Sequence, residues 1–450
     1  MKDNEENRFS ARAARYLAIG AQAGGFAARM AGGRLFGEGG DGDALALARA
    51  LGGLKGPLMK AAQLIATIPE ALPADYAAAL ASLQSEAPPM GAGFVRRRMA
   101  AELGPNWRER FGAFDLHPTA AASLGQVHRA TTPEGEDLAC KLQYPDMASA
   151  VEADLAQLDL ALALHRRIDS AIDAREAAQE VAERLREELD YFREAKHARL
   201  YRIMLADSPE VRVPGVFDGL STGRLLTLEW LEGEKLLSLV EAPEEHRNTI
   251  AKAIFAAWWR PFAHYGVIHG DPHLGNYTVF RGDGAHGEPA GINLLDYGCV
   301  RIFPPSFVGG VIQLYRALRA DNRDQIAHAY ESWGFRGLNS DRIETLTIWA
   351  RFILGPLLED RVRTIADGVK AGAYGRREAA QVHAQLREKG SVQIPREFVF
   401  MDRAAIGLGG AFLHLSARLN FHRLFEEALA DFDLDAVAAR QQAALEQVGL

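Results

Sequence analysis

The sequence predicts an α+β fold, in which helices and strands are grouped along the chain instead of alternating. Helical patterns fill the N-terminal part, a compact group of strands begins near residue 118, and the chain is mostly helical again after about residue 305. The regular strand–helix alternation that a doubly wound parallel sheet requires is missing from the pattern. We therefore expect a small mixed β/α unit set between helical segments.

Composition excludes several classes of function. The 450 residues are 48% hydrophobic and 24% charged, which is ordinary for a chain that buries a core. The formal net charge of −8 argues against nucleic-acid binding through a globally basic surface, so no nucleic-acid partner is expected. Two cysteines, Cys140 and Cys299, are too few for a disulfide framework and favour a reducing compartment.

The N-terminal segment, residues 1–50, is rich in Ala and Gly and lacks the apolar stretch of a signal peptide. No window of about 18 uncharged apolar residues is found, so we expect no spanning helix. The least polar stretch runs from Tyr16 to Gly33 and still contains Gln22 and Arg29. A helical segment and an interfacial segment are the two interpretations here, and we expect a cytoplasmic protein, for which peripheral membrane contact is an open alternative.

The first predicted elements are helices. From Ala44 to about residue 87 the apolar spacing is helical, with breaks at prolines. A further helix is expected over residues 94–110. Its three consecutive arginines, Arg96, Arg97 and Arg98, are expected on a solvated face.

A β-rich group follows. Residues 123–131 and 138–144 have the pattern of strands, and the sequence between them is typical of a turn. The three segments together predict a β-hairpin. The later elements are expected to be helices over 148–168 and 174–206, strands over 211–217 and 224–230 around a Ser-Thr-Gly turn, a helix over 245–267, a short loop over 269–276, paired strands over 277–280 and 292–296, and helices to the C-terminus.

The strongest chemical signal is the loop from His269 to Asn276, HGDPHLGN, followed about twenty residues later by Asp296 in LDYG. In phosphoryl transfer one carboxylate orients the proton of the nucleophile, while an amide oxygen and a second carboxylate hold metal ions that bridge the phosphates. The pattern H-x-D-x-x-x-x-N followed by D-[FY]-G matches this set. Asp271 is therefore the candidate base, and Asn276 and Asp296 are the candidate metal ligands. There are two weaker interpretations: a loop without chemistry, and a metal site formed by His269 and His273.

A second signal is Lys141, within the apolar strand LACKL. Such a lysine costs burial energy unless it is paired, and in kinases it contacts the phosphates and pairs with a helix glutamate. Candidate partners in the later helix are Glu187, Glu188, Asp190 and Glu194. Asp190 and Glu194 share a helix face but Glu188 points away, so these acids cannot all meet one lysine. The alternatives are that Lys141 lies on an exposed strand edge and that the acids form a solvated face of their helix.

Two familiar phosphate-binding motifs are missing from the sequence. There is no G-x-x-x-x-G-K-[ST] loop, and no G-x-G-x-x-G precedes the Lys141 strand. An alanine loop with Ala120, Ala121, Ala122 and Ser123 stands there instead. Alanine lacks the positive φ that glycine adopts freely, so we expect a stiffer cover over the phosphates.

Together these segments resemble the UbiB/AarF family of atypical kinases, whose members support ubiquinone biosynthesis. The segment from Lys60 to Gln63, KAAQ, resembles the family's K-x-G-Q signature, with Ala62 in place of glycine. The alanine loop with SLGQVHRA and LACKLQYP, the segment from Glu188 to Asp190 as E-x-D, and HGDPHLGN with LDYG complete the match. The resemblance extends from about residue 50 to about residue 310, and more weakly to the C-terminus.

The resemblance implies a protein-kinase-like two-lobed fold with an added N-terminal helical extension and a helical C-terminal lobe. The expected domains are the N-terminal segment 1–50, a helical extension over 51–117 with the K-x-G-Q-like motif, a kinase-like N-lobe over 118–232 and a kinase-like helical C-lobe over 233–450.

The resemblance also implies residue roles. Lys141 would pair with Glu194, whereas Glu188 and Asp190 would meet Lys60, whose helix would fold over the active site. The expected catalytic set is Asp271, Lys141 and Glu194; the gating set is Lys60, Gln63, Glu188 and Asp190; and the nucleotide-binding set is Ala120, Ala121, Ala122, Ser123, Lys141, Glu229 and Leu231.

The expected cofactors are ATP and Mg²⁺, and the expected function is that of an atypical kinase or ATPase in or near ubiquinone biosynthesis. A lipid or quinone precursor is the candidate partner. A small-molecule phosphotransferase resembling aminoglycoside and choline kinases shares the H-G-D-x-x-x-x-N loop, but it does not predict the Lys60 segment or the alanine loop. A nucleotide-gated scaffold without catalysis is the third alternative.

Overall fold

The computed structural model describes residues 90–450 except 123, 146, 150, 153–154, 156–181, 184, 283–286, 367–374, 391 and 393–394. The predicted helices before residue 88 and most of those over 148–190 lie outside the described residues. The chain forms two compact units. Unit 1 runs to Glu194 and includes Val216–Trp230, and unit 2 comprises Ala195–Gly215 and Leu231–Leu450. The predicted domain boundaries at residues 50, 117 and 232 stay predictions.

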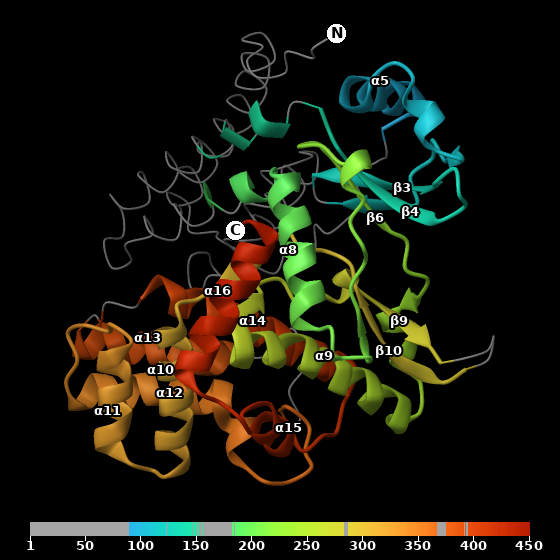
Figure 1. The fold of residues 1–450 in the computed structure, drawn as a ribbon. Coiled ribbons are helices and arrows are strands. Elements are labelled where there is room, and N and C mark those ends of the chain that lie inside the picture. Colours follow the sequence, from blue (N-terminus) through green and yellow to red (C-terminus); the bar gives the residue numbers. More distant parts are fainter. Residues whose placement is uncertain are drawn as a thin grey trace, which may run out of the picture. The chain divides into compact units, whose positions relative to one another are not determined.

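Unit 1 is built on an antiparallel sheet with the order β1-β3-β4-β6, in which β2 also pairs with β3 (Figure 1). Its strands are β1 (Ala113–Phe114), β2 (Ala120–Ala122), β3 (Gly125–Thr131), β4 (Asp137–Gln143) and β6 (Leu225–Glu229). The predicted hairpin over 123–131 and 138–144 is confirmed as β3 and β4, with Lys141 opposite Val127.

Helix α5 (Ala92–Leu103) packs over one face of this sheet (Figure 1). Its Val95 and Met99 are fully buried in one core cluster with Cys140 and Leu142 of β4. The predicted helix over 94–110 is too long, because Gly104 adopts a φ of 90° and a proline follows it. Two 3₁₀ turns, η2 (Trp107–Arg110) and η3 (Asp218–Leu220), also belong to this unit.

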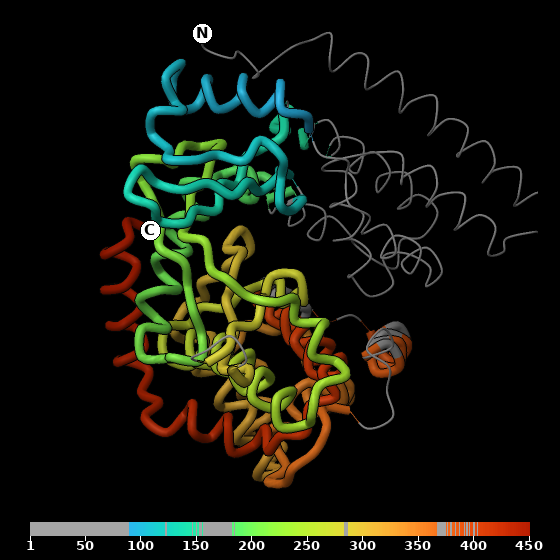
Figure 2. Tube along the Cα trace, turned by 90° about the vertical axis from the view of Figure 1, so that its right-hand side faces the viewer, coloured from blue at the N-terminus to red at the C-terminus, as the bar shows by residue number. Residues whose placement is uncertain are grey.

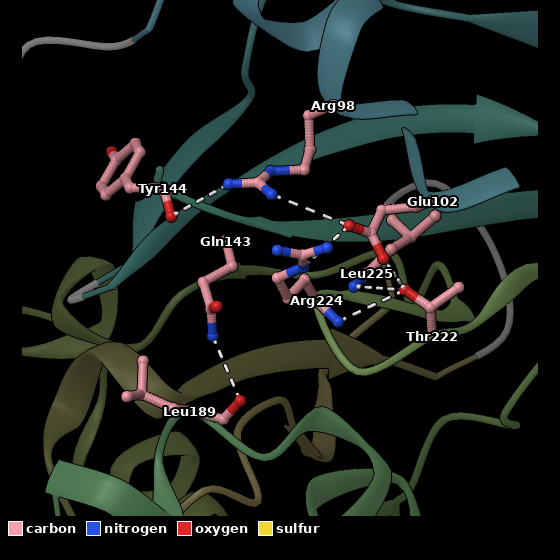
Figure 3. A network of polar contacts seen from close by, with 8 residues as sticks. All are labelled: Arg98, Glu102, Gln143, Tyr144, Leu189, Thr222, Arg224 and Leu225. Carbon is pink, nitrogen blue, oxygen red and sulfur yellow. Dashed lines mark hydrogen bonds and ion pairs between the residues drawn. The ribbon is translucent and has the colours of Figure 1, made fainter. Parts of the chain in front are cut away.

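Arg98 is buried, with 1% exposure, so the prediction that it lies on a solvated face is wrong. Helical periodicity places it on the same side as the apolar residues that contact the sheet. Its Nη2 donates to the carbonyl oxygen of Tyr144 at 3.4 Å, and its Nη1 lies 3.7 Å from the Glu102 carboxylate (Figure 3). Glu102 also pairs with Arg224 at 2.9 Å. The guanidinium therefore keeps polar partners inside the unit.

Unit 2 contains a four-stranded sheet with the order β5-β10-β9-β7 and a two-stranded sheet of β11 and β8. The strands are β5 (Val211–Arg212), β7 (Glu234–Lys235), β8 (Val267–His269), β9 (Tyr277–Arg281), β10 (Pro289–Leu294) and β11 (Val300–Ile302). The predicted pair over 277–280 and 292–296 is confirmed as the antiparallel β9 and β10 (Figure 1).

The prediction that residues 211–217 and 224–230 form two strands around one turn is wrong in its first half. β5 is only two residues long and pairs in parallel with β10 of unit 2, while β6 pairs with β4 of unit 1. Val216 keeps a single bridge to Leu228. Pro214 and Gly215 interrupt the strand, because proline has no N–H to donate to a ladder.

Helix α8 (Tyr191–Met204) contains the boundary between the units. The other helices and turns of unit 2 are η4 (Leu236–Leu239), α9 (Glu244–Tyr265), η5 (Leu274–Asn276), α10 (Pro305–Arg319), α11 (Arg323–Ser332), α12 (Ser340–Leu358), α13 (Arg376–Lys389), α14 (Arg396–His414), α15 (Phe421–Ala428) and α16 (Leu434–Val448).

Helix α9 is the core of unit 2. Its Trp258 and Trp259 are both buried, and α15 and α16 pack against it. The chain ends in α16 (red in Figure 2), where Gly449 O accepts a hydrogen bond from Lys196 Nζ of α8 at 2.6 Å. Trp258 Nε1 of α9 donates to His269 O at 3.2 Å. This hydrogen bond fixes the end of β8, and so the start of the loop that follows it, to helix α9.

Candidate active site

In unit 1, Lys141 of β4 and Glu194 of α8 form an ion pair with 2.6 Å between Nζ and Oε1. The alternation of β4 directs Lys141 away from the face that buries Cys140 and Leu142. The Tyr191 ring centroid lies 5.3 Å from the ammonium, within the range of a cation–π contact. The Glu194 side chain is only 2% exposed, so the ion pair offsets part of the cost of burying this carboxylate. The predicted contact is present, and its role in catalysis stays a prediction.

The segment Glu188-Leu189-Asp190 lies immediately before α8. Asp190 Oδ1 accepts a hydrogen bond from Arg193 N at 3.0 Å, which satisfies a donor in the first turn of the helix. Lys60 and Gln63, the other members of the predicted gating set, lie outside the described residues. Gating by the Lys60 helix therefore stays a prediction.

The alanine segment is a strand instead of the loop that the sequence suggests. Ala120–Ala122 form β2, in which Ala121 pairs with Gln126 of β3. Ser123, the next residue in the sequence, lies outside the described residues. Glu229 ends β6, and Leu231 lies two residues further along, at the start of the second part of unit 2. Nucleotide binding by these residues stays a prediction.

In unit 2, the loop after β8 is organised by His269, which is 2% exposed. Asp271 N donates to His269 Nδ1 at 3.3 Å, and His269 Nε2 lies 2.6 Å from Asp296 O. A main-chain N–H can only donate and a carbonyl can only accept, so Nδ1 is the acceptor and Nε2 is the donor in this arrangement. One imidazole therefore joins the main chains at Asp271 and Asp296.

Asn276 and Asp296 lie at the same end of the β9–β10 hairpin. The main chain of Asn276 accepts a hydrogen bond from Leu295 N at 3.0 Å, one residue before Asp296. Asn276 Nδ2 donates to Asp271 O at 2.8 Å, and Asp296 Oδ1 accepts from Gly298 N at 2.9 Å. All three predicted residues of unit 2 are therefore held in one hydrogen-bonded loop cluster, in which the amide oxygen of Asn276 is the atom suited to bind a cation.

Comparison with known proteins assigns the family. A family model described as the ABC1 atypical kinase-like domain matches residues 82–330, more than half of the chain. This chain belongs to the ABC1 family. The match confirms the resemblance to UbiB/AarF atypical kinases and the α+β kinase-like fold.

Two relatives and one solved structure show how far the likeness to other ABC1 family proteins extends. "Atypical kinase COQ8, mitochondrial" of Saccharomyces cerevisiae is 27% identical over 84% of this chain and 74% of its own. "Atypical kinase COQ8B, mitochondrial" of Danio rerio is 30% identical over 58% of this chain, which spans only 41% of that protein. The structure of Mycobacterium tuberculosis Rv3197 with erythromycin has a TM-score of 0.58 and 27% identity, covering 85% of this chain and 95% of its own.

Both relatives are named as mitochondrial, and the expectation of a cytoplasmic chain with peripheral membrane contact stays a prediction. In the part of the ABC1 family chain that the structure describes, no helix is long and apolar enough to cross a bilayer.

Sequence reasoning missed two groups of residues that support the loop in this ABC1 family chain. His197 Nδ1 lies 3.1 Å from Tyr297 O, and the Tyr201 ring lies 5.7 Å from the Tyr297 ring. The spacing of His197 and Tyr201 at i and i+4 was the available signal. The second group is a contact of α14 with Pro272: a Cβ built at Gly407 would lie 2.8 Å from Pro272 Cγ. Only the fold shows this contact.

Burial changes the ionisation of two groups in this ABC1 family chain. Burial raises the pKa of Tyr277, and the nearby Asp271 charge raises it further, so the phenol stays neutral beside the loop. Burial also raises the pKa of Cys140 to about 12, although a hydrogen bond from Thr227 opposes the shift. A thiol of this kind is not a reactive thiolate, which favours the interpretation of Cys140 as a small core residue.

Proposed function

We propose that this chain binds Mg-ATP and catalyses phosphoryl transfer, as an atypical kinase or ATPase. The observation that carries the proposal is the loop cluster in which Asp271, Asn276 and Asp296 are linked through His269 and the end of the β9–β10 hairpin. The Lys141–Glu194 ion pair supplies the second part of the expected set. Membership of the ABC1 family supports the same conclusion.

The donor set fits Mg²⁺ together with a nucleotide. Asn276 offers an amide oxygen and Asp296 offers a carboxylate, which are hard oxygen ligands. Among the described residues no three His, Cys, Asp or Glu side chains gather as a metal site. Mg²⁺ in kinases needs only one or two protein carboxylates, because phosphate oxygens and water complete its coordination. When bound, Mg²⁺ would neutralise charge that develops on the phosphates.

The remaining roles belong to side chains of this protein. Asp271 would accept or orient the proton of the attacking hydroxyl or water, so that the new P–O bond forms as the bond from the γ-phosphorus to ADP breaks. Lys141 would contact the α- and β-phosphates while Glu194 keeps its ammonium in place. His269 would hold the loop through its two hydrogen bonds to the main chain.

We further propose that the protein acts in or near ubiquinone biosynthesis, with an isoprenoid lipid or a quinone precursor as its partner. The resemblance to UbiB/AarF proteins supports this choice. A small-molecule phosphotransferase remains a weaker alternative, since the ABC1 family match covers the alanine segment as well as the loop. Robust turnover of a soluble alcohol or amino sugar would favour that alternative.

The proposal is tested by calorimetric titration of the protein with ATP in the presence and absence of Mg²⁺. We expect Asp296→Asn to abolish Mg-dependent binding, because the variant loses the carboxylate charge that holds the cation. Asp207→Asn is the matched control, since it makes the same change at an exposed position of unit 2. Equal affinity of wild type and Asp296→Asn would refute the metal role. Cellular function retained by Asp271→Asn despite lost ATP turnover would favour a scaffold.

A further inference from the structure

Gln143 is the last residue of β4 and lies two positions after Lys141, so both side chains leave the same face of the strand. The residue is 4% exposed. Its Nε2 donates to the carbonyl oxygen of Leu189 at 3.2 Å (Figure 3). Its main-chain N–H donates to Arg224 O at 3.0 Å. A buried amide whose own backbone is fixed in a sheet also fixes the segment that its side chain contacts.

The contacted segment leads directly into α8. Leu189 packs against Leu124, Tyr144 and Met147, and it precedes Asp190, which caps the first turn of the helix. The next residue, Tyr191, is 1% exposed, and its hydroxyl would lie 3.0 Å from a Cβ built at Gly125 of β3. The start of α8 is therefore seated on the β3–β4 hairpin.

Two contacts join β4 to this helix start. Lys141 and Gln143 lie roughly 7 Å apart along the strand, at about 3.3 Å per residue. Glu194 lies in the first turn of α8, and Leu189 lies in the turn two residues before the helix begins. Both contacts can form together only when the first turn of α8 holds one position along β4. Loss of the Gln143 contact would remove one of the polar contacts that fix this position and would loosen the Lys141–Glu194 pair.

The opposite side of the β4 end is held by α5. Tyr144, the residue after Gln143, accepts a hydrogen bond from Arg98 (Figure 3). Glu102 accepts from Thr222 Oγ1 at 2.6 Å and pairs with Arg224, whose carbonyl receives the Gln143 N–H. Contacts with α5 and β6 therefore hold the backbone of Gln143 in place. The hydrogen bond from its side chain then holds Leu189 at a fixed position relative to the sheet.

We propose that Gln143 is a positioning residue, which sets the register of α8 against β4 and so keeps Glu194 on Lys141 for nucleotide binding. The inference rests on the proposed function and deepens it. The segment that Gln143 holds also contains Glu188 and Asp190, the acids of the expected gating set.

The test compares Gln143→Met, which keeps the side-chain length but removes the donor, with Gln441→Met. Gln441 is the matched control, because it is a buried glutamine in unit 2 whose Nε2 donates to Tyr265 O and Phe303 O. The first readout needs no nucleotide: the acetylation rate of Lys141 by an amine-reactive ester, followed by mass spectrometry. Glu194→Gln sets the rate for the broken pair.

We expect Gln143→Met to raise the Lys141 acetylation rate and to weaken Mg-ATP affinity, each by roughly 2- to 12-fold, as loss of one hydrogen bond allows. In Gln441→Met neither quantity should change, even though unfolding becomes easier. A double variant with Glu194→Gln should show no further loss, since both changes act through one pair. A wild-type acetylation rate in Gln143→Met overturns the inference. Failure of wild type to bind Mg-ATP would refute the proposed function alone, because the acetylation rate still decides the role of Gln143.

Discussion

Replacing Gly407 by Ala tests whether α14 holds the loop that contains Asp271 in place. A Cβ at Gly407 would lie 2.8 Å from Cγ and 3.4 Å from Cδ of Pro272, the residue after Asp271. Carbon atoms in contact prefer about 3.5–4.0 Å, so the loop or the helix must move by roughly 0.7–1.2 Å. The proline ring cannot rotate away as a flexible side chain would.

The helix is the less mobile of the two partners. Five residues before Gly407, Trp349 Nε1 donates to Asp402 Oδ1 of α14. Just beyond the C-terminal end of α14, Leu415 O accepts from Arg247 Nη1 of α9 at 2.9 Å. With α14 held on both sides of Gly407, the added methyl group should displace the loop that contains Asp271.

A displacement of this size has a large expected effect on turnover. A shift of about 1 Å near reacting atoms can cost up to about 100-fold in rate, so we expect kcat for ATP to fall roughly 10- to 100-fold. Stability should change little, because Ala favours a helix over Gly by about 1 kcal/mol and this offsets part of the crowding. Mg-ATP affinity should change less than kcat, since the metal ligands are not replaced.

The assay is steady-state ATP turnover at saturating Mg-ATP, with urea unfolding measured on the same samples. Gly410→Ala is the matched control, because it lies on the same helix and a Cβ there meets no atom within 4 Å. We expect that control to keep wild-type turnover and to gain up to about 1 kcal/mol of stability. A folded Gly407→Ala protein with wild-type kcat would show that α14 does not position the loop.

Three further predictions concern charge and packing. Glu194→Gln should weaken Mg-ATP binding by at least roughly tenfold in calorimetry and cost about 1–3 kcal/mol, because Lys141 loses its charged partner; unchanged affinity would contradict the pair's role. Burial raises the pKa of Asp402 from its ordinary value of 3.8 to about 7. The native state then holds a proton that the unfolded state has lost, so stability should fall by about 1.4 kcal/mol per unit as pH rises between roughly 4 and 7. Asp402→Asn should flatten that slope in urea unfolding, and a variant that keeps it would exclude Asp402 as the source. Gly125→Ala places a Cβ 2.5 Å from a main-chain oxygen of β4 and should cost about 1–3 kcal/mol in the same assay, whereas wild-type stability would mean that the strands can separate without cost.

Features that depend on local chemistry were predictable from the sequence. The β3–β4 and β9–β10 hairpins follow from apolar strands around turn residues, and the loop from His269 to Asn276 was found by the spacing of its polar groups. The Lys141–Glu194 contact needed the family resemblance, because the acidic helix offered several carboxylates. Here short-range pattern and motif spacing carry most of the information.

Features that depend on distant partners were not predictable in the same way. β5 joins β10 in parallel because a proline–glycine pair ends its own strand, and no periodicity identifies the partner. The sequence predicts that Arg98 is exposed to solvent, whereas the structure buries it beside Glu102 and Tyr144, which supply its polar contacts. The contact between Gly407 and Pro272 joins residues from remote parts of the chain, for which a single sequence carries no signal.

The single imidazole between Asp271 and Asp296 has a consequence for how these two residues are positioned. Because His269 bonds to the main chain at both carboxylate residues, a movement at one residue pulls on the other through a ring that cannot stretch. If Asp296 holds the cation and Asp271 acts as the base, as proposed, a main-chain movement at either residue would also move the other through His269. The metal ligand and the base would then be positioned together instead of separately.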